Sequence, residues 1–165
     1  MISMTEINGM SLEDFVASFG DVAEHSPWVA QAAAQARPFP SRDAMIAAFE
    51  AATRAAPRER QLSLIRAHPD LATRARLTAD STREQAGAGL GSLTADEFAR
   101  FTRLNEAYKT RFGFPFIFAV KGAGKQQILA SFEERAGQPE EDEFEMALTQ
   151  VCRIFRFRIE DRVSP

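Results

Sequence analysis

The sequence is poor in cysteine and histidine, and this limits the chemistry that it can support. Its single cysteine, Cys152, excludes an intramolecular disulfide and every zinc or iron–sulfur site that needs several cysteines. With only His25 and His68 in addition, we expect no metal site. The sequence also lacks the run of about 18 apolar residues that a membrane-spanning helix needs, and residues 1–6 lack the pattern of a targeting segment. We therefore expect a soluble cytoplasmic protein with no membrane contact.

An excess of positive charge is missing as well. The chain has 20 basic and 23 acidic residues and a formal net charge of −3, so no nucleic-acid-binding surface is indicated. The composition, 45% hydrophobic and 26% charged, is typical of a globular protein, and 14 phenylalanines can supply a core. A length of 165 residues fits one domain, so we expect a single domain over residues 1–165.

Helix-start patterns and helical spacing of apolar residues recur along nearly the whole chain. Ser11 and Ser41 are typical N-caps, and the Ser/Thr-x-x-Glu patterns at 81–84 and 94–97 are typical of capping boxes. Residues 113–120 have strand propensity but no second strand to pair with, so we expect a buried extended segment. The prediction is an all-α fold, a single compact domain of about eight or nine packed helices. Helices are expected near 12–19, 27–37, 41–56, 58–67, 81–87, 94–112, 125–135 and 140–162, with a further one beginning at Pro69.

Two polar residues fall where a helix should be apolar. Arg158 lies seven residues after Val151, which places its guanidinium on the apolar face of the last expected helix. Because burial of an unpaired charge is costly, Arg158 must reach solvent near the helix end, form an ion pair, or face an anion-binding cavity. Asn105 interrupts another apolar stripe, where it would tie down the backbone of 113–120 or line a polar pocket.

The residues around His68 allow both a structural and a catalytic interpretation. Histidine is the usual acid or base near neutral pH, but a lone histidine between two helices is often structural. Asp70 would cap the next helix, which Pro69 would begin. A capping box alone explains Ser81 and Glu84, although a helix N-terminus could also form one wall of an anion pocket. The local pattern does not show that these residues come together.

Four motifs stand out along the chain: HPDLA (68–72), STREQAGAGL (81–90), NEAYK (105–109) and RFGFPFI (111–117). Together they resemble the family of 2-oxo-4-hydroxy-4-carboxy-5-ureidoimidazoline (OHCU) decarboxylases, which act last on the route from urate to (S)-allantoin. Segments 24–29 and 157–161 are also similar to that family, and the resemblance extends from about residue 12 to residue 163.

The resemblance implies an all-helical enzyme without metal or cofactor, commonly a homodimer, that acts on OHCU. It implies functional coupling to urate oxidase and 5-hydroxyisourate hydrolase. Catalytic roles are implied for His68, Glu84 and Arg158. Substrate contacts, partly through the backbone, are implied for Pro69, Ser81, Gln85, Phe116, Ile117, Phe118, Ala119 and Val120.

The chemistry of OHCU indicates how such an enzyme could work. The substrate has a carboxylate beside a carbon–nitrogen double bond that can accept the electrons left by carbon dioxide, so no cofactor is required. His68 would move a proton, Glu84 would orient His68 or bind ureido N–H groups, and Arg158 would anchor an anionic or carbonyl group. A related cofactor-free lyase on another ureido compound, or a non-enzymatic helical binding module, remains the alternative.

Two departures from the family pattern accompany the resemblance. The spacer between His68 and Ser81 is shorter than expected of the family, so the loop there should differ. The peroxisomal tripeptide of eukaryotic members is absent from the last three residues, which favours a bacterial-style cytoplasmic enzyme.

Overall fold

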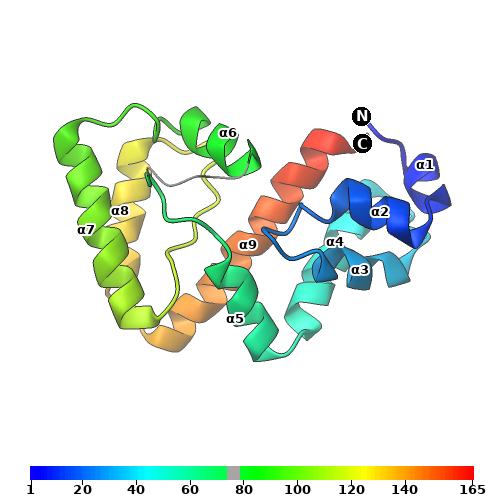
Figure 1. Cartoon of the computed structure of the whole chain (residues 1–165), viewed down its shortest axis with the longest axis horizontal. Coiled ribbons are helices and arrows are strands. Elements are labelled where there is room, and N and C mark those ends of the chain that lie inside the picture. Colours follow the sequence, from blue (N-terminus) through cyan, green and yellow to red (C-terminus); the bar gives the residue numbers. More distant parts are fainter. Residues whose placement is uncertain (74–78) are drawn as a thin grey trace. The chain divides into compact units, whose positions relative to one another are not determined.

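The computed structural model describes residues 1–73 and 79–165, and the regular secondary structure of this part of the chain is helical (Figure 1). The described residues form nine α-helices, one 3-10 helix and no strand, which confirms the all-α prediction. The chain divides into two compact units: unit 1 consists of residues 1–67 and 151–165, and unit 2 of residues 68–150. The helices are α1 Met4–Gly9, α2 Leu12–Phe19, α3 Trp28–Ala33, η1 Ala34–Ala36, α4 Arg42–Ala55, α5 Arg58–Arg66, α6 Ala79–Gly87, α7 Ala95–Phe112, α8 Lys125–Arg135 and α9 Glu140–Arg162.

Unit 1 contains helices α1 to α5 and the last part of α9, packed around phenylalanine side chains. Phe15, Phe19, Phe49 and Phe155 are fully buried, and the rings of Phe49 and Phe155 meet edge to face at a centroid distance of 6.1 Å. The hydroxyls of Ser11 and Ser41 accept hydrogen bonds from the first turns of α2 and α4, which confirms both predicted caps. Burial of these rings joins segments from the two ends of the chain.

The two chain ends also pair directly within unit 1. The N–H of Ile2 donates to the carbonyl of Arg162, and the N–H of Ser164 donates to the carbonyl of Ile2, each at 2.9 Å. Ile2 and Val163 form an isolated parallel bridge, and the ends lie next to each other in Figure 1. The pairing fixes the last turn of α9 to the segment that precedes α1.

Unit 2 contains α6, α7, α8 and the first part of α9. Helix α7 begins with the predicted capping box of Thr94 and Glu97 and ends at Gly113, whose φ of 77° is in the left-handed region that favours glycine. Residues 114–120 connect α7 to α8 without regular secondary structure and are largely buried, as the sequence predicts. The ring of Phe116 stacks on that of Phe132 in α8 at a centroid distance of 3.9 Å, which anchors this connection in the core.

Two expectations about helix starts were wrong, and one helix was not predicted. No helix begins at Pro69, because residues 69–73 form an irregular turn instead. Helix α6 begins at Ala79, so Ser81 is its third residue and not its N-cap; a Ser-x-x-Glu pattern also suits one face of a helix interior. Helix α1 was not predicted, although Ser3 and Glu6 form a capping box. The His68–Ser81 spacer that we expected to be short lies partly outside the described residues.

Candidate active site

His68 begins unit 2 and belongs to an irregular loop over residues 68–73. Its side chain is buried, at 8% exposure. Helix α5 ends at Arg66, and Pro69 prevents its continuation because the residue before a proline disfavours the helical region. The loop contains Ala72 with a φ of 57°, a left-handed conformation that costs a residue with a side chain about 1–3 kcal/mol. Such strain persists only where neighbouring groups hold the backbone in place.

Three side chains of unit 2 hold this loop. Gln85 of α6 accepts a hydrogen bond from the N–H of Ala72 through Oε1 at 2.9 Å. Asn105 of α7 donates from Nδ2 to the carbonyl of Leu71 at 2.8 Å. The third contact is an ion pair of 2.7 Å between Lys109 Nζ and Asp70 Oδ2. Asp70 is therefore an ion-pair partner of α7 and not the helix cap expected for it.

Helix α6 presents the predicted residues of the STREQ motif on one face. Ser81, Glu84 and Gln85 are spaced by three and four residues, which places them together along the helix. Ser81 and Gln85 are buried at 5% and 6% exposure, whereas Glu84 is partly exposed. Because Gln85 also bonds Ala72, this face lies against the loop that carries His68. The structure thus brings the His68 loop and one side chain of the motif into contact.

Asn105 is buried at 6% exposure, as its place on an apolar stripe predicted. The backbone that it holds is the loop after His68, and not residues 113–120 as the sequence suggested. Its Oδ1 atom is buried and accepts no hydrogen bond from the described residues. A buried acceptor of this kind is costly unless a ligand or water satisfies it. The alternative in which Asn105 lines a polar pocket therefore remains open beside its structural role.

The predicted contact segment from Phe116 to Val120 offers mainly its backbone. The rings of Phe116 and Tyr108 meet edge to face at 5.5 Å, and Ile117, Ala119 and Val120 are buried, so these side chains belong to the core. Phe118 is the partly exposed member. The buried side chains are engaged in the core, which leaves the peptide groups of the segment and the side chain of Phe118 for the substrate contact that the resemblance implies.

A buried polar cluster next to this segment was missed in the sequence. Arg135 of α8 binds Glu143 of α9 through Nε at 2.6 Å and donates from Nη1 to the carbonyl of Ile117 at 2.6 Å. The hydroxyl of Tyr108 donates to the same Glu143 oxygen at 2.5 Å. Burial, and then the hydrogen bond to Glu143, raise the pKa of Tyr108 far above its ordinary value, so the hydroxyl stays protonated. Arg135 shares the buried face of α8 with Phe132 and could have been found as Arg158 was.

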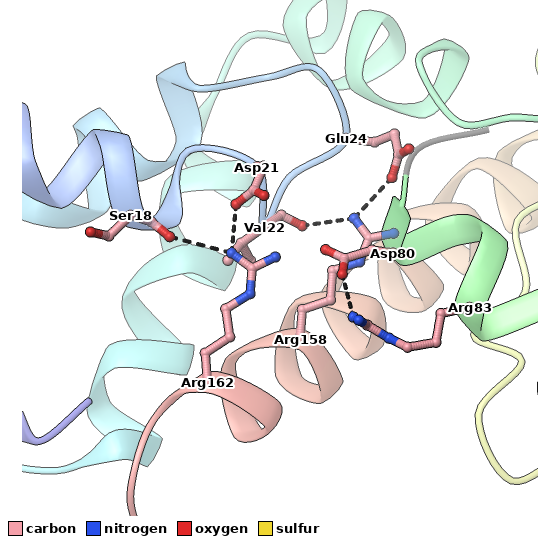
Figure 2. A network of polar contacts seen from close by, with 8 residues as sticks. All are labelled: Ser18, Asp21, Val22, Glu24, Asp80, Arg83, Arg158 and Arg162. Atoms are coloured by element: carbon pink, nitrogen blue, oxygen red, sulfur yellow. Dashed lines mark hydrogen bonds and ion pairs between the residues drawn. The ribbon is translucent and has the colours of Figure 1, made fainter. Parts of the chain in front are cut away.

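Arg158 lies in unit 1 and is one of the most deeply buried charges there, at 3% exposure. Its Nη1 lies 2.8 Å from Glu24 Oε2 and donates to the carbonyl of Val22 at 3.2 Å (Figure 2). Of the three alternatives for this guanidinium, exposure at the helix end is excluded and an ion pair is observed. One turn later in α9, Arg162 binds Asp21 and the carbonyl of Ser18. Both arginines therefore fix the chain between α2 and α3 to the last turns of α9.

No group of three or more histidine, cysteine, aspartate or glutamate side chains that could hold a metal ion occurs in residues 1–73 and 79–165. Among the same residues, no helix is long and apolar enough to cross a membrane. In unit 2 the described structure brings together the loop that carries His68, the side-chain amides of Gln85 and Asn105, and the ion pair of Asp70 with Lys109. This set is suited to hydrogen bonding and proton transfer.

Comparison with known proteins gives matches over almost the whole chain. A family model described as OHCU decarboxylase matches residues 8–160. A 2-oxo-4-hydroxy-4-carboxy-5-ureidoimidazoline decarboxylase of Haloferax volcanii is 44% identical over 163 residues, which cover 99% of this chain and 97% of the relative.

Two further relatives are longer than this chain. The uric acid degradation bifunctional protein PucL of Bacillus subtilis is 42% identical over 99% of this chain, which spans 33% of that relative. The crystal structure of an (S)-allantoin synthase superimposes with a TM-score of 0.83 at 29% identity, and here the chain spans 54% of the other.

Proposed function

This chain belongs to the OHCU decarboxylase family, and we propose that it converts OHCU into (S)-allantoin and carbon dioxide as the last step of urate degradation. The observation that carries the proposal is the contact between the strained His68 loop and the Ser81–Gln85 face of α6, made through Ala72 and Gln85. In a member of this family, that contact supports a site in which the proposed acid–base residue and the proposed substrate-binding motif act together. The enzyme is a cofactor-independent carboxy-lyase.

The reaction needs controlled proton transfer from the enzyme, because the substrate ring itself accepts the electrons. When the carbon–carbon bond to the carboxylate breaks, carbon dioxide leaves and the electron pair moves into the ring toward the adjacent carbon–nitrogen double bond. The hydroxyl on the same carbon then loses its proton and becomes the ring carbonyl of allantoin. The ring nitrogen that received the electron pair takes up one proton, and another is added to the neighbouring ring carbon, which bears the ureido group. The face on which that proton arrives determines whether (S)-allantoin forms.

We assign the proton transfers to His68. Its buried position in unit 2 excludes bulk water from competing with a directed transfer, which supports the assignment. Glu84, partly exposed on α6, would set the orientation of His68 or bind ureido N–H groups. Ser81, Gln85 and Pro69 would contact the ring and ureido atoms.

Arg158 is proposed as the electrostatic anchor of an anionic or carbonyl group of the substrate. Its ion pair with Glu24 supports this role in one respect, because the pair holds a long flexible side chain in one orientation. The attraction between this buried guanidinium and a substrate anion is also stronger than that of a solvated charge, because water screens it less. The assignment of Arg158 to the same substrate as His68 rests on the family resemblance.

The remaining parts of the proposal concern the setting of the enzyme. We propose that residues 1–165 make up one OHCU decarboxylase domain, that two copies form a homodimer, and that it works in the cytoplasm after urate oxidase and 5-hydroxyisourate hydrolase. The bifunctional relative named for uric acid degradation supports this coupling. Backbone contacts to the substrate are assigned to Phe116, Ile117, Phe118, Ala119 and Val120.

The proposal is tested by circular dichroism of the allantoin formed from urate with urate oxidase and the hydrolase. A rapid (S)-allantoin signal that depends on this protein is expected, because the uncatalysed reaction gives racemic product. His68→Asn should lower the rate by about 10²–10⁴-fold, since positioned proton transfer is worth that much. The matched control is His25→Asn, which should keep full activity. His25 has a left-handed φ of 47°, a conformation that asparagine tolerates. A slow baseline identical with and without the folded protein would move the function to another ureido compound or to binding.

A further inference from the structure

Two buried side chains hold the backbone on either side of Phe118. On one side, the carbonyl of Ile117 accepts from Arg135 Nη1 at 2.6 Å; on the other, the N–H of Ala119 donates to Gln150 Oε1 at 3.0 Å. Arg135 and Gln150 are each only 7% exposed, so solvent does not compete for these bonds. The two bonds belong to the two consecutive peptide units that meet at Phe118.

Arg135 is itself held by two further contacts. Its guanidinium forms a buried ion pair with Glu143, whose Oε1 atom also accepts from the hydroxyl of Tyr108. The same guanidinium lies 4.3 Å from the centre of the Phe116 ring, within cation–π distance. A guanidinium fixed in this way can orient the Ile117 carbonyl with little loss of side-chain entropy on substrate binding.

The planarity of the peptide unit sets the directions of the N–H and carbonyl of Phe118. A trans peptide is planar, and its carbonyl and N–H point in opposite directions. The Ile117 carbonyl points toward Arg135, so the N–H of Phe118 in that unit points away from it. The N–H of Ala119 points toward Gln150, so the carbonyl of Phe118 points away from Gln150.

Phe118 therefore has a donor and an acceptor in fixed directions. It is the partly exposed residue among 116–120, and neither its N–H nor its carbonyl has a hydrogen-bond partner among the described residues. Buried or partly buried backbone groups are normally paired, and the ones that are not usually bind a ligand or water. A donor next to an acceptor matches the N–H and carbonyl of one amide.

We propose that Arg135 and Gln150 are positioning residues that present the backbone N–H and carbonyl of Phe118 to an amide group, –NH–CO–, of the substrate. The inference rests on the proposed function, because OHCU has such groups in its ring and in its ureido arm. The N–H of Phe118 donates to the substrate carbonyl, and the carbonyl of Phe118 accepts from the substrate N–H. An analogue without that N–H leaves a backbone carbonyl unpaired and is discriminated against.

The first test is the variant Gln150→Met, which removes the acceptor of the Ala119 N–H and keeps the side-chain length. We expect the KM for OHCU and the inhibition constant of (S)-allantoin to rise about tenfold, equivalent to about 1.4 kcal/mol, with kcat within about threefold of wild type. A merely structural defect does the reverse, because a smaller folded fraction lowers apparent kcat and leaves KM unchanged. Gln61→Met is the matched control: its amide binds backbone carbonyls of Thr53 and Arg54 in unit 1, and its KM should equal that of wild type.

The second test is Arg135→Lys, which keeps a charge for Glu143 but cannot reproduce the planar guanidinium contacts. Arg135→Lys should also raise the KM for OHCU about tenfold. If Gln150→Met does not fold, this variant tests the positioning role by itself. In wild-type protein labelled with ¹⁵N, saturating (S)-allantoin should shift the amide resonance of Phe118 more than that of Ala119. Unchanged KM in both variants, or an unmoved Phe118 amide, would overturn the inference. An inactive wild-type protein would instead overturn the proposed function.

Discussion

Removal of one partner from the buried ion pair of Arg158 and Glu24 should destabilise unit 1 strongly. At 2.8 Å and an effective dielectric constant of about 20, the two charges attract by about 6 kcal/mol, which offsets the cost of desolvating them. The variant Arg158→Met leaves the carboxylate of Glu24 buried without this cation. Such a deletion typically costs about 3–5 kcal/mol, or about 6–20 °C in Tm for a protein of this size.

The double variant Arg158→Met/Glu24→Leu separates the lost charge pair from the lost packing. With both charges gone, neither member of the pair is left buried without the other, and stability should return to within about 1 kcal/mol of wild type or exceed it. Urea unfolding of wild type, both single variants and the double variant, followed by far-ultraviolet circular dichroism, completes the cycle. We expect a coupling free energy above about 2 kcal/mol between the two positions.

The reasoning fails if the single variants unfold at the same urea concentration as wild type, or if the two losses simply add in the double variant. The double variant also tests the anchoring role of Arg158. It should be folded but lack the guanidinium, so both the decarboxylation rate and the affinity for (S)-allantoin should fall. A folded double variant with the dissociation constant of wild type would show that Arg158 does not contact this ligand.

Two further predictions concern unit 2. Asn105→Ala removes the hydrogen bond to the Leu71 carbonyl. It should lower the free energy of unfolding in urea by about 1–3 kcal/mol and also lower kcat/KM. The control Asn8→Ala loses two hydrogen bonds to Phe39 in unit 1, and it should lose stability but keep its activity per folded molecule. The N–H of Thr94, and then Lys125, lower the pKa of Glu97 from its ordinary value of 4.5. Glu97→Gln should therefore be less stable than wild type above about pH 4.5, and the difference should vanish as the pH falls through the lower folded-state pKa. A difference that grows in acid would contradict this sign.

Helix positions were largely predictable because their determinants are local. The caps Ser11 and Ser41 and the capping box of Thr94 lie next to the helices that they begin, so a few residues contain the information. The same local pattern misled at Ser81, since Ser-x-x-Glu spacing looks alike at a cap and inside a helix. Only the position of the first helical turn distinguishes the two cases.

The polar residues of the core were predictable as exceptions but not in their partners. Arg158 and Asn105 were detected because each interrupts an apolar helix face. Their partners, Glu24 and the Leu71 carbonyl, lie 134 and 34 residues away, and no local rule specifies such pairings. Arg135 gives the same helical-face signal beside Phe132 and was overlooked, although it contacts the segment for which substrate binding is proposed.

The division of the chain has a consequence for synthesis on the ribosome. Unit 2 is one continuous stretch, residues 68–150, whereas unit 1 combines residues 1–67 with residues 151–165. Translation proceeds from the N-terminus, and nascent chains fold as soon as a complete unit has emerged. Unit 2 is thus complete before unit 1, since Glu24 and the ring of Phe49 have no contact with Arg158 and Phe155 until these have been synthesised. Until the last turns of α9 leave the exit tunnel, the N-terminal part lacks the side chains that complete its core.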